Sequence, residues 1–316
     1  MKIIESASEA RAYFAEIKKK GQTIGFVPTL GGLHKGHELL MEKARQENDV
    51  VILSIFLNPM QFRKKQYLAY PSDFEEDKQI AKQKNVDVIF HPTVAEMFTK
   101  VQALDDILQF QTEEFRLRSS KKFVIDDCHG IDNLIRVPSN LVYCLDGKMH
   151  PWVFDGSTTI VNRFFDILQP HKAYFGEKDI QQLAILTKMA TKYFPEIEVI
   201  GVPTLRETDG LAFSSRNVLL SNKERQSALG VYEAIKFGEK QIRLGELNSK
   251  IILNKIRERI QIIKPVVEID YIDIVDKKTL TPVKQIKTDV ILYVAFFING
   301  IRLTDTLIYT EEKIYV

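Results

Sequence analysis

The chain has 316 residues, with 44 Lys and Arg against 42 Asp and Glu, a formal net charge of +2 and 45% hydrophobic residues. This balance excludes a strongly basic nucleic-acid binder, so we expect no nucleic acid as a partner. The apolar content supports one large or two modest globular domains, and no apolar run approaches the roughly 20 residues that span a bilayer, so we expect no membrane partner either.

Helices and strands alternate along the first two thirds of the sequence. An amphipathic helix is predicted over 6–20, and the apolar run 24–27 predicts a buried strand that ends at Pro28 and the pair Gly31-Gly32. Another helix follows from about Gly36. Further strands are predicted over 50–57, 86–90, 172–175 and 198–202, with helices over 73–84, from Gly156 to 168 and from Ile180. This alternation predicts an α/β fold, a Rossmann-like parallel sheet with helices on both faces, over residues 1–202.

The pattern changes after residue 202. Two helical segments, about 222–243 and 247–262, precede strands near 266–275, 289–297 and 300–304. Helices followed by antiparallel strands predict a smaller C-terminal α+β domain over 203–316, with 306–316 as a short extension.

The first candidate site is the turn between the strand at 24–27 and the next helix. The backbone N–H groups of a glycine turn and the positive end of a helix can bind phosphate together. His34 and His37 can donate hydrogen bonds there as negative charge builds in a transition state. No Gly-Lys-Ser/Thr follows the glycines, so the turn is not a P-loop, and only Glu38 is nearby to complete a zinc site. Ordinary surface or core histidines are the alternative interpretation.

A second candidate is the loop at 58–62, which follows a buried strand. Gln61 is placed there to hold a substrate, although Asn58-Pro59 can also simply end the strand. The acidic run at 75–77 is interpreted as a solvated helix face, with Asp77 as a weak candidate for a metal ligand or a water network.

Two further loops carry candidate phosphate ligands. Lys178 lies beside a predicted helix start whose N-cap is Asp179, a position that suits a bound polyphosphate, whereas a solvated lysine is the ordinary alternative. Ser214, Ser215 and Arg216 can supply hydroxyl donors and a guanidinium fork for triphosphate oxygens, or they belong to a polar interdomain loop.

Four motifs together resemble a known family. The stretch from Gly25 to Arg45 resembles the nucleotide-binding signature of the HIGH superfamily of adenylyl and nucleotidyl transferases. With NPMQF at 58–62, FGEKDIQQL at 175–183 and DGLAFSSRN at 209–217, the chain resembles the pantoate–β-alanine ligase family, the pantothenate synthetases, over most of its length.

This resemblance implies ATP-dependent condensation of pantoate with β-alanine through a pantoyl adenylate, with pyrophosphate and AMP released, in pantothenate and coenzyme A biosynthesis. It implies a homodimer whose C-terminal domain acts as a lid that excludes water. Mg²⁺ would accompany ATP and be held mainly by phosphate and water.

The resemblance also implies roles for individual residues. His37 is the main donor to the developing charge, and the other implied catalytic residues are His34, Lys178, Ser214, Ser215 and Arg216. Gln61, Gln182 and Asn58 are implied to bind the hydroxy acid. The implied ATP contacts come from Leu30, Gly31, Gly32, Leu33, His34, Lys35, Gly36, His37, Gly176, Glu177, Lys178, Asp179, Leu205, Phe213, Ser214, Ser215 and Arg216.

The chain departs from the family pattern in two places. We interpret 99–131 as an insertion, with helical spacing from Leu104 to Phe115 and a turn, rather than a metal cluster, at 126–129. His150 and Val153 stand where the family has Arg and His, which leaves open a related ligase for a different acid. An ATP-binding homologue without catalysis and a metal-dependent hydrolase that uses both histidines and Glu38 also stay open.

The cysteines and the N-terminus indicate a compartment. Cys128 and Cys144, the only two cysteines, form no metal or redox motif, and the charged N-terminus does not resemble a signal peptide. A reducing, cytoplasmic location fits both observations.

Overall fold

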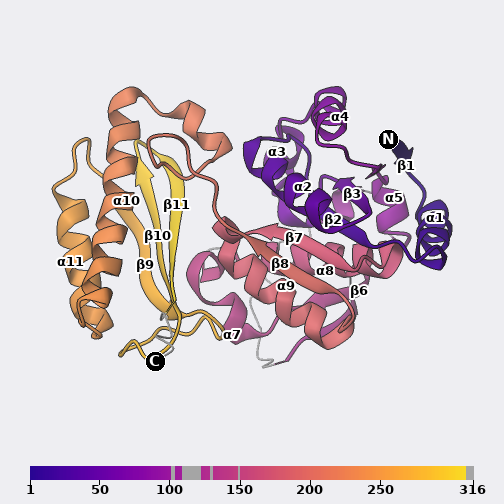
Figure 1. The fold of residues 1–316 in the computed structure, drawn as a ribbon. Helices are drawn as coiled ribbons and strands as arrows, with labels where there is room; N and C mark the ends of the chain where they lie inside the picture. Colours follow the sequence, from indigo (N-terminus) through magenta and orange to yellow (C-terminus); the bar gives the residue numbers. More distant parts are fainter. Residues whose placement is uncertain (101–103, 109–121, 129–130, 149, 311–316) are drawn as a thin grey trace. The chain divides into compact units, whose positions relative to one another are not determined.

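The computed structural model describes residues 1–100, 104–108, 122–128, 131–148 and 150–310 (Figure 1). The chain forms two compact units. The first comprises Met1–Val142 and Gly147–Pro203, and the second comprises Tyr143–Asp146 and Thr204–Val316. The expected division at 202–203 puts residues 143–146 in the first domain, whereas in the structure they pack with the second unit.

A six-stranded parallel sheet forms the centre of the first unit, with the strand order β1-β4-β3-β2-β7-β8. The strands are β1 (Lys2–Ile4), β2 (Ile24–Thr29), β3 (Val50–Ile55), β4 (Val88–Phe90), β7 (Lys172–Gly176) and β8 (Glu198–Val202). The strand order reverses between β2 and β7. In open α/β sheets ligands bind outside the carboxyl ends of the strands at such a switch point, so this is where a site is expected.

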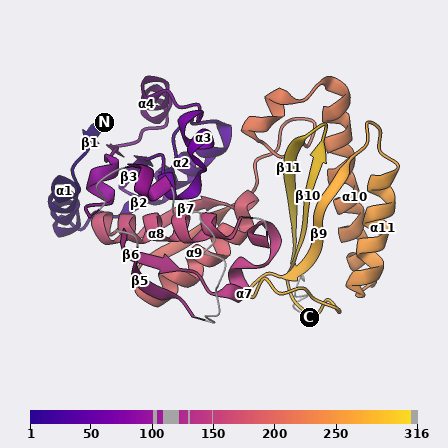
Figure 2. The same ribbon diagram turned by 180° about the vertical axis from the view of Figure 1, so that it is seen from behind.

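Helices cover both faces of the sheet. They are α1 (Ala7–Lys19), α2 (Lys35–Glu47), α4 (Phe74–Gln83), α8 (Pro151–Leu168) and α9 (Ile180–Tyr193). Phe26 and Ile52 pack with α1, α8 and α9, whereas the alternate strand residues Val27 and Leu53 pack with α2 and α4. Helices α8 and α9 lie side by side (Figure 2). Because both faces are covered, every residue of β3 is buried, which explains why its sequence is apolar except for the small Ser54.

Two boundaries and one additional strand differ from the sequence expectation for a clear physical reason. Strand β2 continues through Pro28 to Thr29, because β2 pairs with β7 only at Gly25 and Phe26, and Pro28 pairs with Ser54 of β3 alone. The edge strand β1 is not predicted at all, since three residues give no periodic signal. Helix α8 begins at Pro151 rather than Gly156, as proline is favoured in the first helical turn.

The segment interpreted as an insertion contains a short helix and a strand that pairs antiparallel with the strand after it. Helix α6 covers Leu104–Leu108, and β5 (Val124–Cys128) pairs with β6 (Ile131–Arg136). The turn predicted at 126–129 is wrong for 126–128, which belong to β5, while His129 and Phe115 lie outside the described residues.

The second unit is an α+β layer. Its antiparallel sheet has the order β11-β10-β9, formed by β9 (Glu268–Asp276), β10 (Val290–Ile298) and β11 (Ile301–Tyr309). Helices α10 (Asn222–Arg243) and α11 (Ser249–Gln261) contribute Val231, Ile235 and Ile256 to a common core with the sheet. Strand β11 runs to Tyr309, so the expected extension begins later than residue 306. The predicted fold class is confirmed. Among the described helices, none is long and apolar enough to cross a bilayer.

Candidate active site

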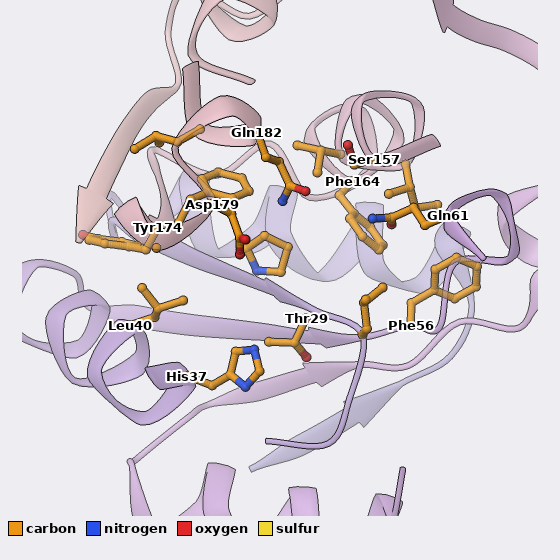
Figure 3. Close-up of a pocket in the computed structure, with 17 residues that line it drawn as sticks. Thr29, His37, Leu40, Phe56, Gln61, Ser157, Phe164, Tyr174, Asp179 and Gln182 are labelled. Atoms are coloured by element: carbon orange, nitrogen blue, oxygen red, sulfur yellow. The ribbon is translucent and has the colours of Figure 1, made fainter. Parts of the chain in front are cut away.

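A cavity of about 200 Å³ lies at the switch point between β2 and β7 (Figure 3). Both strands deliver residues to it at their carboxyl ends, and α8 and α9 complete the wall. Its lining comprises Pro28, Thr29, Leu30, His37, Leu40, Phe56, Gln61, Ser157, Ile160, Val161, Phe164, Tyr174, Phe175, Gly176, Asp179, Gln182 and Leu183.

The two histidines form a hydrogen-bonded cap at the start of α2. His34 is the N-cap residue, and its Nδ1 accepts from the backbone N–H of Gly36 at 3.1 Å. The Nδ1 of His37 accepts from the backbone N–H of His34 at 3.3 Å, and the rings stack with centroids 4.0 Å apart. Because both Nδ1 atoms accept, each ring carries its proton on Nε2. His37 lines the cavity and therefore offers it an N–H donor.

Both imidazoles are neutral near pH 7. Burial, followed by the neighbouring charges of His34 and Lys178, lowers the pKa of His37 to about 3. Burial and then Lys178 also lower the pKa of His34. The structure thus brings Lys178 close enough to act electrostatically on both rings, although Lys178 does not line the cavity.

The glycine turn is held by Asp77, which corrects two expectations. Its carboxylate is 2% exposed and accepts from the backbone N–H of Gly32 at 2.9 Å and of Leu33 at 2.6 Å. Asp77 is therefore a buried structural residue, and neither the solvated helix face nor the metal role fits it. The N–H groups of Gly32 and Leu33 are consequently not directed at a ligand. Gly31 and Gly32 have φ values of +90° and +66°, which glycine adopts without strain.

The other residues of this stretch divide between the cavity and the surface. Leu30 lines the cavity. Lys35 is exposed and pairs with Glu38 at 3.0 Å, and Glu38 also pairs with Lys84 at 2.8 Å. These ion pairs leave Glu38 unsuited to a zinc site with the histidines. Within the described ranges, no group of three or more His, Cys, Asp and Glu side chains could hold a metal ion.

Gln61 faces the cavity from η1 and Gln182 from α9, and Figure 3 shows their amide groups turned toward each other. Gln61 ends the 3₁₀ turn η1 (Pro59–Gln61), and its Oε1 accepts from Asn58 Nδ2 at 2.9 Å. Asn58 is fully buried and also donates to the Gly156 carbonyl at 3.0 Å. Asn58 was expected to bind the hydroxy acid directly. The buried amide instead orients Gln61 through the hydrogen bond to its Oε1.

The loop after β7 contributes Gly176 and Asp179 to the cavity. Asp179 occupies the N-cap position of α9 as predicted, but its side chain makes no capping hydrogen bond. Figure 3 shows its carboxylate directed into the cavity. Glu177 does not line the cavity, because its side chain lies against Gly201 of β8.

Most of the apolar lining was not identified from sequence as site residues. Ile160, Val161 and Phe164 belong to the predicted stripe of α8, which suggested only core packing. Ser157 on the same helix was the sequence signal that could have indicated a site on this face, since a hydroxyl is unusual on an otherwise apolar helix face. It lines the cavity while donating to the Phe154 carbonyl at 3.2 Å.

The remaining candidates form a loop within the second unit. The N–H of Phe213 donates to the Leu205 carbonyl at 2.8 Å, which closes a hairpin-like turn. The Ser214 hydroxyl accepts from the Arg216 N–H at 3.3 Å at the start of the 3₁₀ segment η6 (Ser215–Leu219). The exposed Arg216 donates through Nη1 to the Arg302 carbonyl at 2.8 Å.

Comparison with known proteins gives one consistent answer. A family profile described as pantoate-beta-alanine ligase matches residues 2–308. The pantothenate synthetase of Thermotoga petrophila is 40% identical over 309 residues, which cover 98% of this chain and 99% of the relative. That of Geobacillus thermodenitrificans is 37% identical over 314 residues, 99% and 98% of the two chains.

Solved structures agree. The pantothenate synthetase of Thermus thermophilus superposes with a TM-score of 0.79 at 34% identity, covering 97% of this chain and 99% of that one. A Francisella tularensis pantoate-beta-alanine ligase, described as complexed with beta-gamma ATP and beta-alanine, has a TM-score of 0.67 at 29% identity and covers 97% of both chains.

Proposed function

The chain belongs to the pantoate-beta-alanine ligase family, and from this premise we propose that it forms pantothenate from pantoate, β-alanine and ATP through a pantoyl adenylate. It is an ATP-binding ligase of pantothenate biosynthesis. The observation that carries the proposal is the switch-point cavity, in which a neutral His37 donor and two glutamine amides face a wall of apolar side chains from α8.

In the first step an oxygen of the pantoate carboxylate attacks the α-phosphorus of ATP, and the bond to the β-phosphate bridge breaks to release pyrophosphate. Ile160, Val161 and Phe164 suit the dimethyl carbon of pantoate, while Gln61 and Gln182 suit its hydroxyl and carboxylate oxygens. Held in this way, the carboxylate is oriented for attack, which is most of what such chemistry requires of a protein.

Charge stabilisation falls to His37, His34 and Lys178. A neutral imidazole with its proton on Nε2 donates to a phosphate oxygen, and Lys178 supplies the positive charge that the neutral rings lack. Mg²⁺ would be held mainly by phosphates and water, since the Asp77 carboxylate already accepts two backbone N–H groups.

In the second step the amine of β-alanine attacks the acyl carbon, the bond from that carbon to the phosphate oxygen breaks, and AMP leaves. The loop with Ser214, Ser215 and Arg216 holds the triphosphate in the first step, and the second unit serves as a lid that excludes water from the adenylate.

The protein acts in the cytoplasm as a homodimer. His150 and Val153 lie outside the cavity lining, so their difference from the family pattern gives no reason to favour another acid.

The direct test is formation of AMP and pantothenate from the three substrates with Mg²⁺, with each substrate omitted in turn. We expect one AMP per pantothenate and no AMP without pantoate. AMP formation with a different acid but not with pantoate would contradict the proposal, and so would ATP binding without turnover of any acid.

A further inference from the structure

Four residues, Tyr143–Asp146, interrupt the first unit and pack with the second. We call them the strap. Helix α7 (Ser139–Val142) precedes the strap in the first unit, and Gly147 returns the chain to that unit. Cys144 and Leu145 are 5% and 1% exposed, and Leu145 has a φ of +44°, a left-handed conformation that few non-glycine residues adopt. Tight burial in a disfavoured conformation indicates that its surroundings determine the path of the strap.

Within the second unit the strap is bound through Asp146. One carboxylate oxygen accepts from Arg302 Nη2 at 2.7 Å, and the other accepts from the Tyr293 hydroxyl. Arg302 also pairs with Asp270 at 2.8 Å. The backbone carbonyl of Arg302 accepts the hydrogen bond from Arg216, the candidate triphosphate ligand. Arg302 therefore links Asp146 to Arg216 of the proposed ATP loop by hydrogen bonds.

Within the first unit a single side chain fastens both flanks of the strap. Gln181 of α9 is 4% exposed, and its Oε1 accepts from the Gly147 N–H at 3.1 Å. Its Nε2 donates to the carbonyls of Leu141 at 2.8 Å and Val142 at 3.1 Å. A Cβ at Gly147 would lie 1.8 Å from the Val142 carbonyl oxygen, so only glycine permits this close approach.

Gln181 belongs to the segment that carries the proposed substrate ligands. It directly precedes Gln182, and Asp179 and Lys178 lie just before it, yet its own side chain does not line the cavity. A buried amide with three backbone partners has no role in contacting substrate. Its hydrogen bonds instead join the start of α9 to the residues that flank the strap on both sides.

We propose, on the basis of the proposed function, that Gln181 and Asp146 are positioning residues that couple nucleotide binding at the Arg216 loop to acid binding at Gln182 through the strap. Occupation of the loop by triphosphate changes the bonds of Arg216, and the route Arg302, Asp146, strap and Gln181 carries the effect to α9. The coupling is reciprocal, so pantoate also increases the affinity for nucleotide.

The test measures pantoate affinity by titration calorimetry, with and without a non-reactive ATP analogue and Mg²⁺, in the wild type, Asp146→Asn and Gln181→Leu. We expect the analogue to tighten pantoate binding by about tenfold in the wild type and by less than about twofold in both variants. Pantoate affinity without the analogue should stay within about twofold of the wild type in Asp146→Asn, which a general loss of structure would not allow.

Asp270→Asn is the matched control, because it removes the other carboxylate of Arg302 without touching the strap. It should keep the wild-type coupling. Full coupling in Asp146→Asn, or equal loss in Asp270→Asn, overturns the proposal. If Gln181→Leu does not fold, the proposal is tested by Asp146→Asn and Asp146→Glu. Asp146→Glu keeps a carboxylate and should retain part of the coupling that Asp146→Asn loses. A wild type that binds no pantoate refutes the proposed function instead. The strap is then judged by hydrogen exchange of the α9 amides, which the analogue should slow in the wild type and in Asp270→Asn but not in Asp146→Asn, and equal slowing in all three proteins overturns the proposal.

Discussion

Replacement of Asp77 tests whether a buried carboxylate builds the proposed phosphate turn. The variant Asp77→Ala removes the acceptor of two backbone N–H groups, at 2.9 and 2.6 Å, from a site that is 2% exposed. Hydrogen bonds to a charged group contribute about 1.5–3 kcal/mol each, so for two of them we expect a loss of about 3–6 kcal/mol in the free energy of unfolding. Asp77→Asn keeps one acceptor oxygen and should lose about half as much.

The single tryptophan makes this measurable. Trp152 lies in the first unit, so its fluorescence during urea unfolding follows the unit that contains Asp77. The control is Glu76→Gln, an exposed acid on the same helix, which should change stability by less than about 0.5 kcal/mol. If Asp77→Ala unfolds at the same urea concentration as Glu76→Gln, the assigned role of Asp77 is wrong.

Three further predictions concern the histidine, a helix contact and the second unit. The pKa of His37 is about 3 in the folded protein, below its unfolded value near 6.5, so its contribution to stability is complete above pH 6.5 and is lost as the pH falls toward 3. Between pH 8 and 5, urea unfolding should therefore show a stability loss that is about 2 kcal/mol larger in the wild type than in His37→Gln; the same loss in both proteins would contradict the assignment. In Gly156→Ala the new Cβ would lie 2.9 Å from Met60 Cβ, which should displace η1 and Gln61 and cost about 1–3 kcal/mol of stability. The KM for pantoate should rise and the KM for ATP should not. An unchanged KM for pantoate would argue against the assigned role of Gln61. Asp305→Ala removes the partner of Arg206, a side chain that is 3% exposed, and should destabilise the second unit by about 3–5 kcal/mol. Calorimetry should then show one transition at a lower temperature, while the urea midpoint followed by Trp152 fluorescence stays unchanged.

Local patterns made the sheet and the first site predictable. Strand β3 reads as six consecutive apolar or small residues because both faces are covered, and the turn before α2 combines glycines with a histidine cap. These signals lie within a few residues of one another, so the sequence displays them directly. Gln61 follows a predicted strand in the same way, whereas the site roles of Asp179 and Gln182 were implied by the family resemblance.

What the sequence did not reveal depends on contacts between distant segments. Asp77 reaches back 45 residues to Gly32, so its role could not be separated from that of its exposed neighbours Glu75 and Glu76. Asn58 turns its amide to Gly156, 98 residues away, and that glycine marks a close helix contact rather than a helix start. Only tertiary packing distinguishes such residues from ligands and caps.

The central claim, that the cavity at the β2–β7 switch point activates pantoate with ATP, is tested most directly by pantoate-dependent exchange of labelled pyrophosphate into ATP without β-alanine. This assay isolates the adenylation step. We expect exchange in the wild type, a loss of about 10²-fold or more in His37→Ala, and a smaller loss in His37→Gln, which retains an N–H donor. Wild-type exchange rates in a folded His37→Ala protein, or no exchange in a wild type that binds ATP and pantoate, would contradict the account.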